Sequence, residues 1–406
     1  MKGIKIIFAL VVITTILGIQ SCKKFLNVVP VDNLSGNVFW TSKADVESFT
    51  WGIYNRYRDA TTSLIFFPAS GDMRCAPVTP NVGGREYITL LRQNNINEIL
   101  ARANTTWFNN DFFGFNRITK WDTFYAAIQF ANILEDKMLN DETITFLSAA
   151  EKKAYRAEAV FMRNLCYFML VRLYGDVPYY KEPYHSKALA RTNMLTVLNS
   201  CIDDMNVVVE DLPWTYEEPS IIAVRAMRGS AGILLMHMNM WVAGFTKDDP
   251  TAYYEEVARL GEYVINNNSG AYQLLSLEET KKIFKGRSKE GLFEVVQNFN
   301  YGENFPNNAS FSDYVLREPY KRLVPTTFLR YDRRFLEELY PGSVPDRRRD
   351  FWFDEYMFDQ TGKMVLLKFV NIFAQEGEDL NPDDNQIVFR YADVFLLAAE
   401  ALAELG

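Results

Sequence analysis

Residues 157–180 read AEAVFMRNLCYFMLVRLYGDVPYY, and this stretch decides how the chain folds. Its apolar residues recur every three or four positions, which is the period of one face of an α-helix. Further apolar residues, among them Met162 and Met169, fill the other faces, as is typical of a helix buried between helices. Gly175 predicts a left-handed C-terminal cap, and Pro178 prevents the helix from continuing. The stretch therefore predicts a central, buried helix.

Similar helical patterns occupy much of the remaining chain. Their apolar residues predict helices over 42–59, 119–138, 194–212, 225–242, 251–267 and 388–405. Ser148 and Glu151 predict a capping box that opens the central helix, because each side chain can bond to the other residue's backbone. Helices joined by short connections favour a stack of helical hairpins. The predicted fold class is mostly α, with tetratricopeptide-like helical hairpins.

Two long stretches, 60–118 and 269–388, interrupt this helical pattern. Both are rich in Asn, Gly, Pro and aromatic residues and are longer than ordinary connections. Residues 292–296 predict one short strand there, and the rest is expected to be irregular loop insertions. Long loops on a rigid scaffold commonly carry binding residues, so we expect a binding site in these stretches.

The beginning of the chain has the composition of a secretory signal. Two lysines precede an uninterrupted apolar run, and Ser21 stands directly before Cys22. The apolar run is too short to span a bilayer, which takes about 20 residues. We therefore predict a signal peptide over 1–21 and acylation of Cys22, because acyl chains hold a protein at a membrane without a spanning helix.

Composition disfavours several other kinds of protein. The chain has 43 basic and 51 acidic side chains, a net charge of −8, which is unsuited to a polyphosphate partner such as nucleic acid. The four cysteines form no Cys-x-x-Cys pair, and the histidines are His185 and His237. We therefore expect no metal site, no cofactor and no disulfide framework. His237 lies among apolar residues and is expected at a helix interface.

The residues of the central helix also resemble a family signature. The Ala-Glu-Ala opening, Arg163, the Tyr167-Phe168 pair and VRLYGDVP over 171–178 resemble the central helix of the SusD/RagB family. FLNVVP over 25–30 resembles that family's mature N-terminus, and RYAD over 390–393 resembles the start of a later family helix. Members of this family are outer-membrane lipoproteins that capture nutrients, usually glycans, for an adjacent transporter.

This resemblance implies an architecture and a location. The mature chain, 22–406, is expected to be a single SusD-like α domain with an N-terminal part over 22–215. The remainder, 216–406, is expected to be incomplete, since family members continue from the last helix into a partner helix. The chain is expected at the cell outer membrane, lipid-anchored and exposed at the surface. Its expected role is to bind oligosaccharide and deliver it to a SusC-type TonB-dependent transporter.

One aromatic cluster in the first long stretch suits glycan binding. The C–H face of a sugar ring packs on an aromatic ring, and its hydroxyls bond to Asn, Asp or Arg side chains. Trp107 and Asn110 offer both kinds of group and resemble the family's pairing of Trp with Asn. Tyr301, in a second Asn-rich and aromatic cluster, is the candidate for the other wall of the platform. The alternative is that these rings pack as small cores beneath the loops.

The polar candidates precede that cluster in the chain. Asp72 and Arg74 belong to a Gly-Asp-Met-Arg segment, and Arg74 is the candidate for the arginine that family sites direct at sugar hydroxyls. Arg85 is its competitor for that role. The complete candidate set for glycan binding is Asp72, Arg74, Trp107, Asn110 and Tyr301.

Two other functions are alternatives to glycan capture. A RagB-type lipoprotein of the same architecture would bind peptide through backbone hydrogen bonds in a groove. A glycoside hydrolase would need two carboxyl groups that meet only in space, so sequence spacing does not test it. The chain offers no Gly-x-Ser-x-Gly motif and no phosphate-binding glycine loop, and we therefore predict a binding protein without catalytic residues.

Overall fold

The computed structural model describes most of the chain from residue 39 onward. The described residues are 39–62, 66–75, 77–81, 83, 86–105, 115, 118, 120–298, 310–321, 323–370 and 384–406. The chain divides into two units, Met1–Val46 and Glu47–Gly406. In the first unit, Asp45 accepts hydrogen bonds from the Thr41 N–H and the Ser42 hydroxyl at 3.0 and 2.8 Å, and helix α2 (Lys43–Thr61) begins there. All other described elements belong to the second unit.

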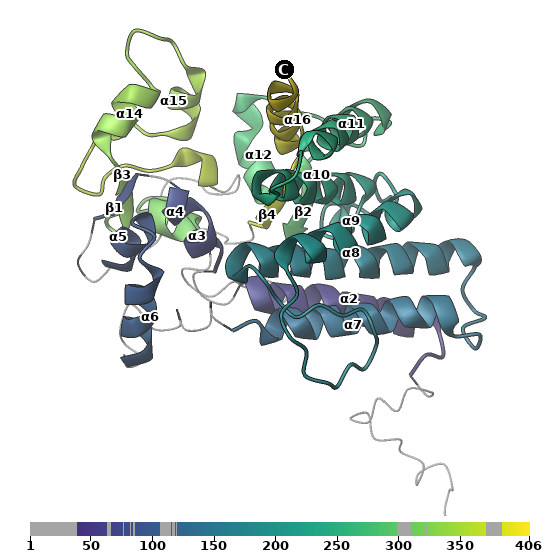
Figure 1. Cartoon of the computed structure of the whole chain (residues 1–406). Helices are drawn as coiled ribbons and strands as arrows, with labels where there is room; N and C mark the ends of the chain where they lie inside the picture. Colours follow the sequence, from purple (N-terminus) through teal and green to yellow (C-terminus); the bar gives the residue numbers. More distant parts are fainter. Residues whose placement is uncertain are drawn as a thin grey trace, which may run out of the picture. The chain divides into compact units, whose positions relative to one another are not determined.

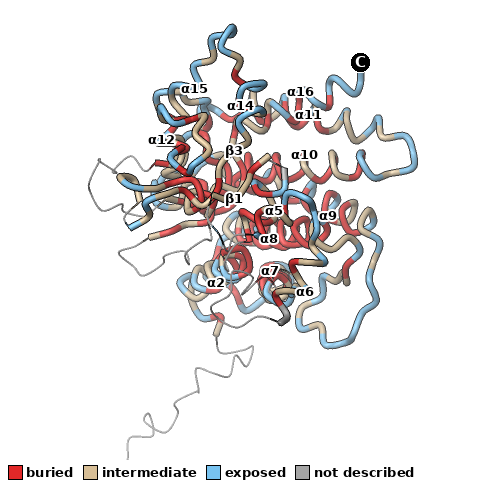
Figure 2. The backbone as a smooth tube through the Cα atoms, turned by 90° about the vertical axis from the view of Figure 1, so that its left-hand side faces the viewer, coloured by how far each residue is buried: buried red, intermediate tan, exposed pale blue. Residues whose placement is uncertain are grey.

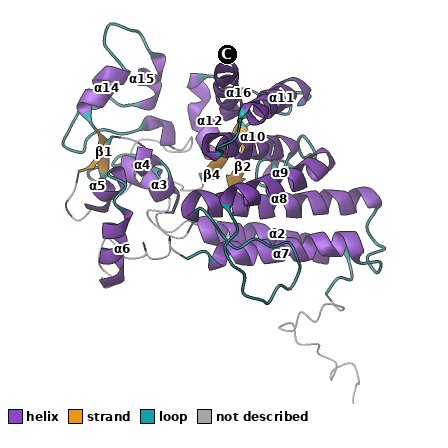
Figure 3. Ribbon diagram, viewed as in Figure 1, coloured by secondary structure: helices purple, strands orange, loops and turns teal. Residues whose placement is uncertain are grey.

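Long helices form the scaffold of the second unit (Figure 1). In chain order they are α7 (Asp122–Asn140), α8 (Ala149–Tyr174), α9 (Met194–Val208), α10 (Arg228–Phe245), α11 (Thr251–Asn267) and α16 (Tyr391–Leu405). Each of α7 to α10 packs against the next helix in the chain, and α16 packs against both α11 and α10. Helices make up most of the described chain, and the described strands form two small pairs (Figure 3). The predicted fold class, mostly α with stacked helical hairpins, is confirmed.

Helix α8 is the buried centre of this scaffold, as its sequence predicts. Its capping box is present, with the Glu151 N–H donating to Ser148 Oγ at 3.2 Å and the Ser148 N–H donating to Glu151 Oε2 at 2.8 Å. Every residue over 157–171 is buried, and Figure 2 shows this run along α8. The helix ends at Gly175, whose φ of +69° is one that glycine adopts without a steric penalty.

A fully buried arginine joins three of the scaffold helices. The Arg163 side chain on α8 is 0% exposed, and its guanidinium forms an ion pair with Glu135 of α7 and another with Asp204 of α9, the latter at 3.0 Å. It also donates to Asn132 Oδ1 at 3.2 Å. A buried charge is tolerated only when it is paired and hydrogen-bonded, so this cluster specifies how α7, α8 and α9 pack together.

The two long stretches between the scaffold helices form a second hydrophobic core. It contains Met73, Tyr87, Tyr314, Leu336 and other buried residues from both stretches. The contributing elements are α3 (Phe66–Ser70), α4 (Asp72–Cys75), α5 (Glu86–Arg92), α6 (Ile96–Thr105), α13 (Ser312–Val315), α14 (Arg333–Leu339) and α15 (Arg347–Trp352). Strand β1 (Val78–Pro80) pairs antiparallel with β3 (Leu329–Tyr331). The expectation that these stretches are almost wholly irregular is therefore wrong, because most of these helices are too short to show a period in sequence.

A second strand pair corrects one helix boundary. Strand β2 (Gly291–Val295) confirms the predicted strand, and it pairs antiparallel with β4 (Gln386–Arg390). The helix predicted from residue 388 therefore begins only at Tyr391, because buried Phe389 pairs with Phe293 across the sheet. The remaining short elements are α12 (Thr280–Lys285) and the 3₁₀ turns η2 (Val209–Asp211), η3 (Pro219–Ile221), η4 (Leu277–Glu279) and η6 (Leu367–Phe369).

Candidate glycan-binding cleft

The structure describes only part of the predicted site. Cys22, Trp107, Asn110 and Tyr301, together with the competing Arg85, lie outside the described residues. Asp72 and Arg74 are described, and both lie on the short helix α4. Both residues line the same cavity, so the structure brings these two candidates together.

That cavity lies where α3 and α4 meet the C-terminal end of α8. Its volume is about 330 Å³. Apolar and aromatic residues line it together with polar ones, and the polar groups come from Ser70, Asp72, Arg74, Arg172 and Gln386. The aromatic members are Phe66, Phe67 and Trp241, of which Phe67 and Trp241 are partly exposed.

Arg74 is held at this cavity by the end of a neighbouring helix. Its Nη2 donates to Asn94 Oδ1 at 2.5 Å. Asn94 follows α5 in the left-handed conformation, with φ of +54°, which asparagine tolerates better than most residues. The Asn94 N–H closes the helix on the Leu91 carbonyl at 2.9 Å, so the cap that ends α5 also positions the guanidinium.

A second cavity of about 290 Å³ adjoins the first. Asp72, Gln386 and Ile387 line both cavities, and we call the two together the ring-lined cleft. In the second cavity the partly exposed rings of Phe284 and Phe369 face polar groups at its rim. The polar lining residues are Asp72, Ser310, Ser312, Lys368, Asp384, Asn385, Gln386 and Arg390.

Asp72 is the acidic group common to both cavities. Reduced contact of its carboxyl group with water raises the pKa of Asp72, and the nearby charge of Lys368 lowers it. A carboxylate between aromatic walls accepts hydrogen bonds from vicinal sugar hydroxyls. Asp72 therefore offers a hydrogen-bond acceptor to both cavities.

Several residues of the cleft carry no signal in the sequence that marks them as binding residues. Arg172 lies in the last turn of α8, inside the recognised signature, but nothing in the helical pattern marked it as a binding residue. Trp241 belongs to a helix that is apolar on nearly all faces, so it resembled an ordinary core residue. Lys368 and Phe284 come from a 3₁₀ turn and a six-residue helix, which leave no periodic signal in sequence.

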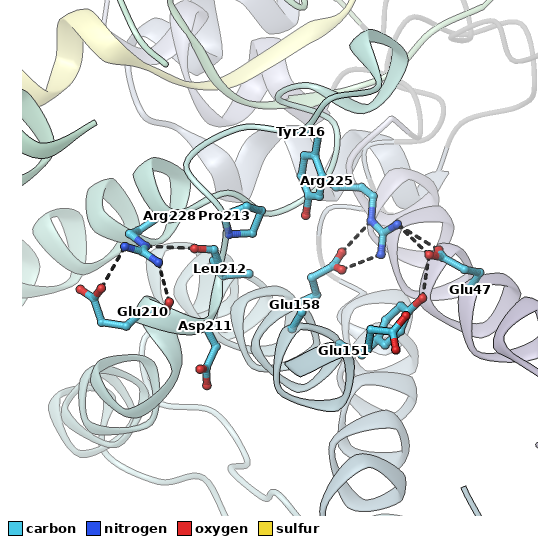
Figure 4. A pocket seen from close by; sticks show the side chains of 12 residues that line it. Glu47, Glu151, Glu158, Glu210, Asp211, Leu212, Pro213, Tyr216, Arg225 and Arg228 are labelled. Atoms are coloured by element: carbon cyan, nitrogen blue, oxygen red, sulfur yellow. Dashed lines mark hydrogen bonds and ion pairs between the residues drawn. The ribbon is translucent and has the colours of Figure 1, made fainter. Parts of the chain in front are cut away.

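Another cavity, of about 390 Å³, lies beside α8 and the loop that precedes α10 (Figure 4). Both arginines that line it are paired with carboxylates. Arg225 bonds to Glu158 at 2.5 Å and to Glu47 at 2.9 Å, and Arg228 lies 3.0 Å from Glu210. Because Arg225 and Arg228 are already paired with carboxylates, we assign these ion pairs to the stability of the scaffold rather than to ligand binding.

His237, Cys166 and Cys201 lie in packed surroundings between helices. His237 Nε2 lies 2.9 Å from Asp393 Oδ2, so the histidine joins α10 to α16 at a helix interface, as predicted. Cys166 and Cys201 are buried free thiols, and burial raises the pKa of both, which keeps them protonated.

Over the described residues, His, Cys, Asp and Glu form no group of three or more that could hold a metal ion. None of the described helices is long and apolar enough to cross a membrane.

Comparison with known sequences places the chain among SusD-like proteins. Residues 83–234 match a SusD-like family model described as "Starch-binding associating with outer membrane". A SusD-like protein of Formosa agariphila is 25% identical over 418 aligned residues, covering 95% of this chain and 76% of that protein.

Solved structures agree with the sequence comparison. A SusD-like protein described as laminarin-binding superimposes with a TM-score of 0.63 at 19% identity, covering 89% of this chain and 81% of the other, which shows a shared fold. A SusD homologue of Bacteroides thetaiotaomicron superimposes with a TM-score of 0.80 at 38% identity, covering 91% of this chain and 78% of that one. With this identity over most of both chains, the chain belongs to the SusD-like family.

Proposed function

We propose that this protein is an outer-membrane lipoprotein that binds oligosaccharide in the ring-lined cleft. One observation carries the proposal: partly exposed aromatic rings line two adjoining cavities together with carboxylate, amide, hydroxyl and guanidinium groups. Such a wall suits a sugar, because its apolar C–H face packs on the rings while its hydroxyls bond at the rim.

The relatives support this class of ligand. The matched family model is described as starch-binding, and one solved protein of the same fold is described as laminarin-binding. Both descriptions name glucose polymers, and they favour glycan over peptide as the ligand of this chain. The predicted residues Trp107, Asn110 and Tyr301 complete the proposed site, with Trp107 as a stacking platform.

The proposal includes a transporter partner and an anchor. Family membership supports delivery to a SusC-type TonB-dependent transporter, and the signal-like segment before Cys22 supports acylation there. We expect Cys22→Ala to remain uncleaved or to appear as a soluble periplasmic product, because no described helix replaces the lipid as an anchor. Labelling cells with a fatty-acid analogue tests this, and wild-type protein that takes up no label contradicts it.

Binding is tested on the mature chain, residues 22–406, with glycan and peptide arrays followed by calorimetric titration. The variant is Phe67→Ala, which removes a partly exposed ring from the cleft, and the control is Phe146→Ala, which removes an exposed ring that does not line it. We expect Phe67→Ala to weaken glycan binding by about tenfold and Phe146→Ala to leave it unchanged.

Three results would contradict the proposal. Binding of peptides without glycans would favour the RagB-type alternative. Release of reducing sugar from a bound glycan would show a hydrolase. Equal binding by wild type and Phe67→Ala, with equal melting temperatures, would show that the ligand does not bind in the cleft.

A further inference from the structure

The charge of the ring-lined cleft is opposite to that of the whole chain. The chain carries a net charge of −8. Among the described residues that line the cleft, however, four are cationic, Arg74, Arg172, Lys368 and Arg390, and only Asp72 and Asp384 are acidic. Cationic side chains therefore outnumber acidic ones at the surface that the proposed function assigns to ligand.

Arg172 is a cation held against aromatic rings, with no carboxylate partner among the described residues. Its guanidinium lies over the Phe168 ring at 5.4 Å and over the Trp241 ring at 5.6 Å. The described part of the chain gives it no ion pair. Reduced contact with water lowers the pKa of the Arg172 guanidinium, and the charge of Arg74 lowers it further, so the two cations repel each other across the first cavity.

In the second cavity, Lys368 is likewise a cation that lies against aromatic rings. Its Nζ lies 4.9 Å from the Phe369 ring centre, 5.1 Å from that of Trp352 and 5.4 Å from that of Phe284. No ion pair to Lys368 occurs within the described residues. Reduced contact with water lowers the pKa of the Lys368 ammonium, the charge of Asp72 raises it, and the charge of Arg390 lowers it.

The aromatic surroundings hold Arg172 and Lys368 in positions where they can bind an anionic group. Aromatic rings attract a cation and restrict its side chain, but they do not neutralise its charge. A side chain that is already held in place loses less conformational freedom when a ligand binds. Arginine also presents paired N–H donors that match the two oxygens of a carboxylate or sulfate.

We propose that the cleft selects acidic glycans, whose carboxylate or sulfate groups pair with Arg172 and Arg74 in one cavity and with Lys368 in the other. This inference rests on the proposed function and narrows its substrate class. Because the cations line separate but adjoining cavities, acidic groups on two different sugar residues of one oligosaccharide meet them together. The uncharged stretches of the sugar rings pack against the aromatic wall between them.

The test uses two pairs of probes with matched backbones. Oligogalacturonides are compared with the same oligosaccharides after carboxyl reduction, and sulfated carrageenan oligosaccharides are compared with their desulfated forms. We expect at least one charged probe to bind about tenfold more tightly than its neutral form, and this preference to shrink between about 50 and 500 mM sodium chloride. The pair that shows the preference distinguishes carboxylate from sulfate.

Variants locate the effect in the cleft. Arg172→Gln and Lys368→Gln each remove one cation there, and Arg334→Gln removes an exposed cation on α14 that does not line it. We expect each cleft variant to lose about fivefold or more in affinity for the charged probe and a clearly smaller factor for the neutral probe, with an unchanged melting temperature. Arg334→Gln is expected to bind both probes as the wild type does.

The outcomes separate this inference from the proposed function. Equal binding of charged and neutral probes overturns the acidic-glycan inference and leaves glycan binding intact. An equal loss of both probes in Arg172→Gln also overturns it, because the arginine would then bond to hydroxyls. If no glycan of either kind binds to the folded wild type, the proposed function fails and the inference fails with it.

Discussion

A buried glutamate behind the cleft predicts an unusual pH dependence of stability. Glu294 on β2 is 1% exposed, and its Oε2 accepts hydrogen bonds from the Arg287 N–H and from Asn385 Nδ2, both at 2.8 Å. Within the described chain, Glu294 Oε1 has no hydrogen-bond partner. Burial raises the pKa of Glu294 from 4.5 to about 7, although the bonds from Asn385 and Arg287 lower it.

The sign and size of the effect follow from this pKa. Below pH 4.5 the carboxyl group is protonated in both the folded and the unfolded chain, so folding bears no cost of burying a charge. Between pH 4.5 and about 7 only the unfolded chain releases the proton, so the free energy of unfolding falls as pH rises. The interval of about 2.5 pH units, at 1.36 kcal/mol each, corresponds to about 3 kcal/mol.

Glu294→Gln removes this titration and keeps an oxygen that accepts both hydrogen bonds. We therefore expect the stability of Glu294→Gln relative to wild type to rise by about 3 kcal/mol between pH 4.5 and pH 7.5. Urea unfolding of both proteins at several pH values measures this, and the difference between them cancels the titration of groups that they share. Glu338→Gln, an exposed change on α14, is the control, and its difference from wild type is expected to stay constant within about 0.5 kcal/mol.

A difference between Glu294→Gln and wild type that does not change with pH would refute this reasoning. It would mean that Glu294 stays ionised in the folded protein, with the hydrogen bonds fully offsetting its burial. The result also concerns the cleft, because Asn385, which donates to Glu294, lines the second cavity.

Three further predictions concern packing and binding. Arg163→Met should lower the free energy of unfolding by about 3 kcal/mol in urea titrations, because Glu135 and Asp204 lose their buried partner; a loss below about 1 kcal/mol would contradict this. Gly261→Ala should lower the melting temperature, because the added Cβ would lie 2.7 Å from Ala398 Cβ on α16, whereas Gly244→Ala, with no atom within 4 Å, should not. Trp107→Ala should weaken glycan binding by about 1–3 kcal/mol in calorimetric titration with little change in melting temperature; a stability loss of about 3–5 kcal/mol would instead place that ring in a core.

Features that depend on residues close together in the sequence could be predicted from it. The central helix, its capping box and its Gly175 cap were predicted correctly, because helical period and cap chemistry are local. The strand at β2 was predicted for the same reason. The helix predicted from residue 388 begins later, because pairing with a strand nearly 100 residues earlier competes with local helical preference.

The ring-lined cleft depends on tertiary structure. Asp72 comes from α4, Arg172 from α8, Lys368 from a 3₁₀ turn and Gln386 from β4, and no sequence spacing relates them. The sequence by itself determined the helical scaffold and the family, since hydrophobic period and motif are written in adjacent residues. Only the tertiary packing of the two long stretches with the C-terminal end of α8 and with β4 brought an excess of cations to one cleft of an acidic chain. Electrostatic and stacking interactions act through space, so their partners are known only when the chain is folded.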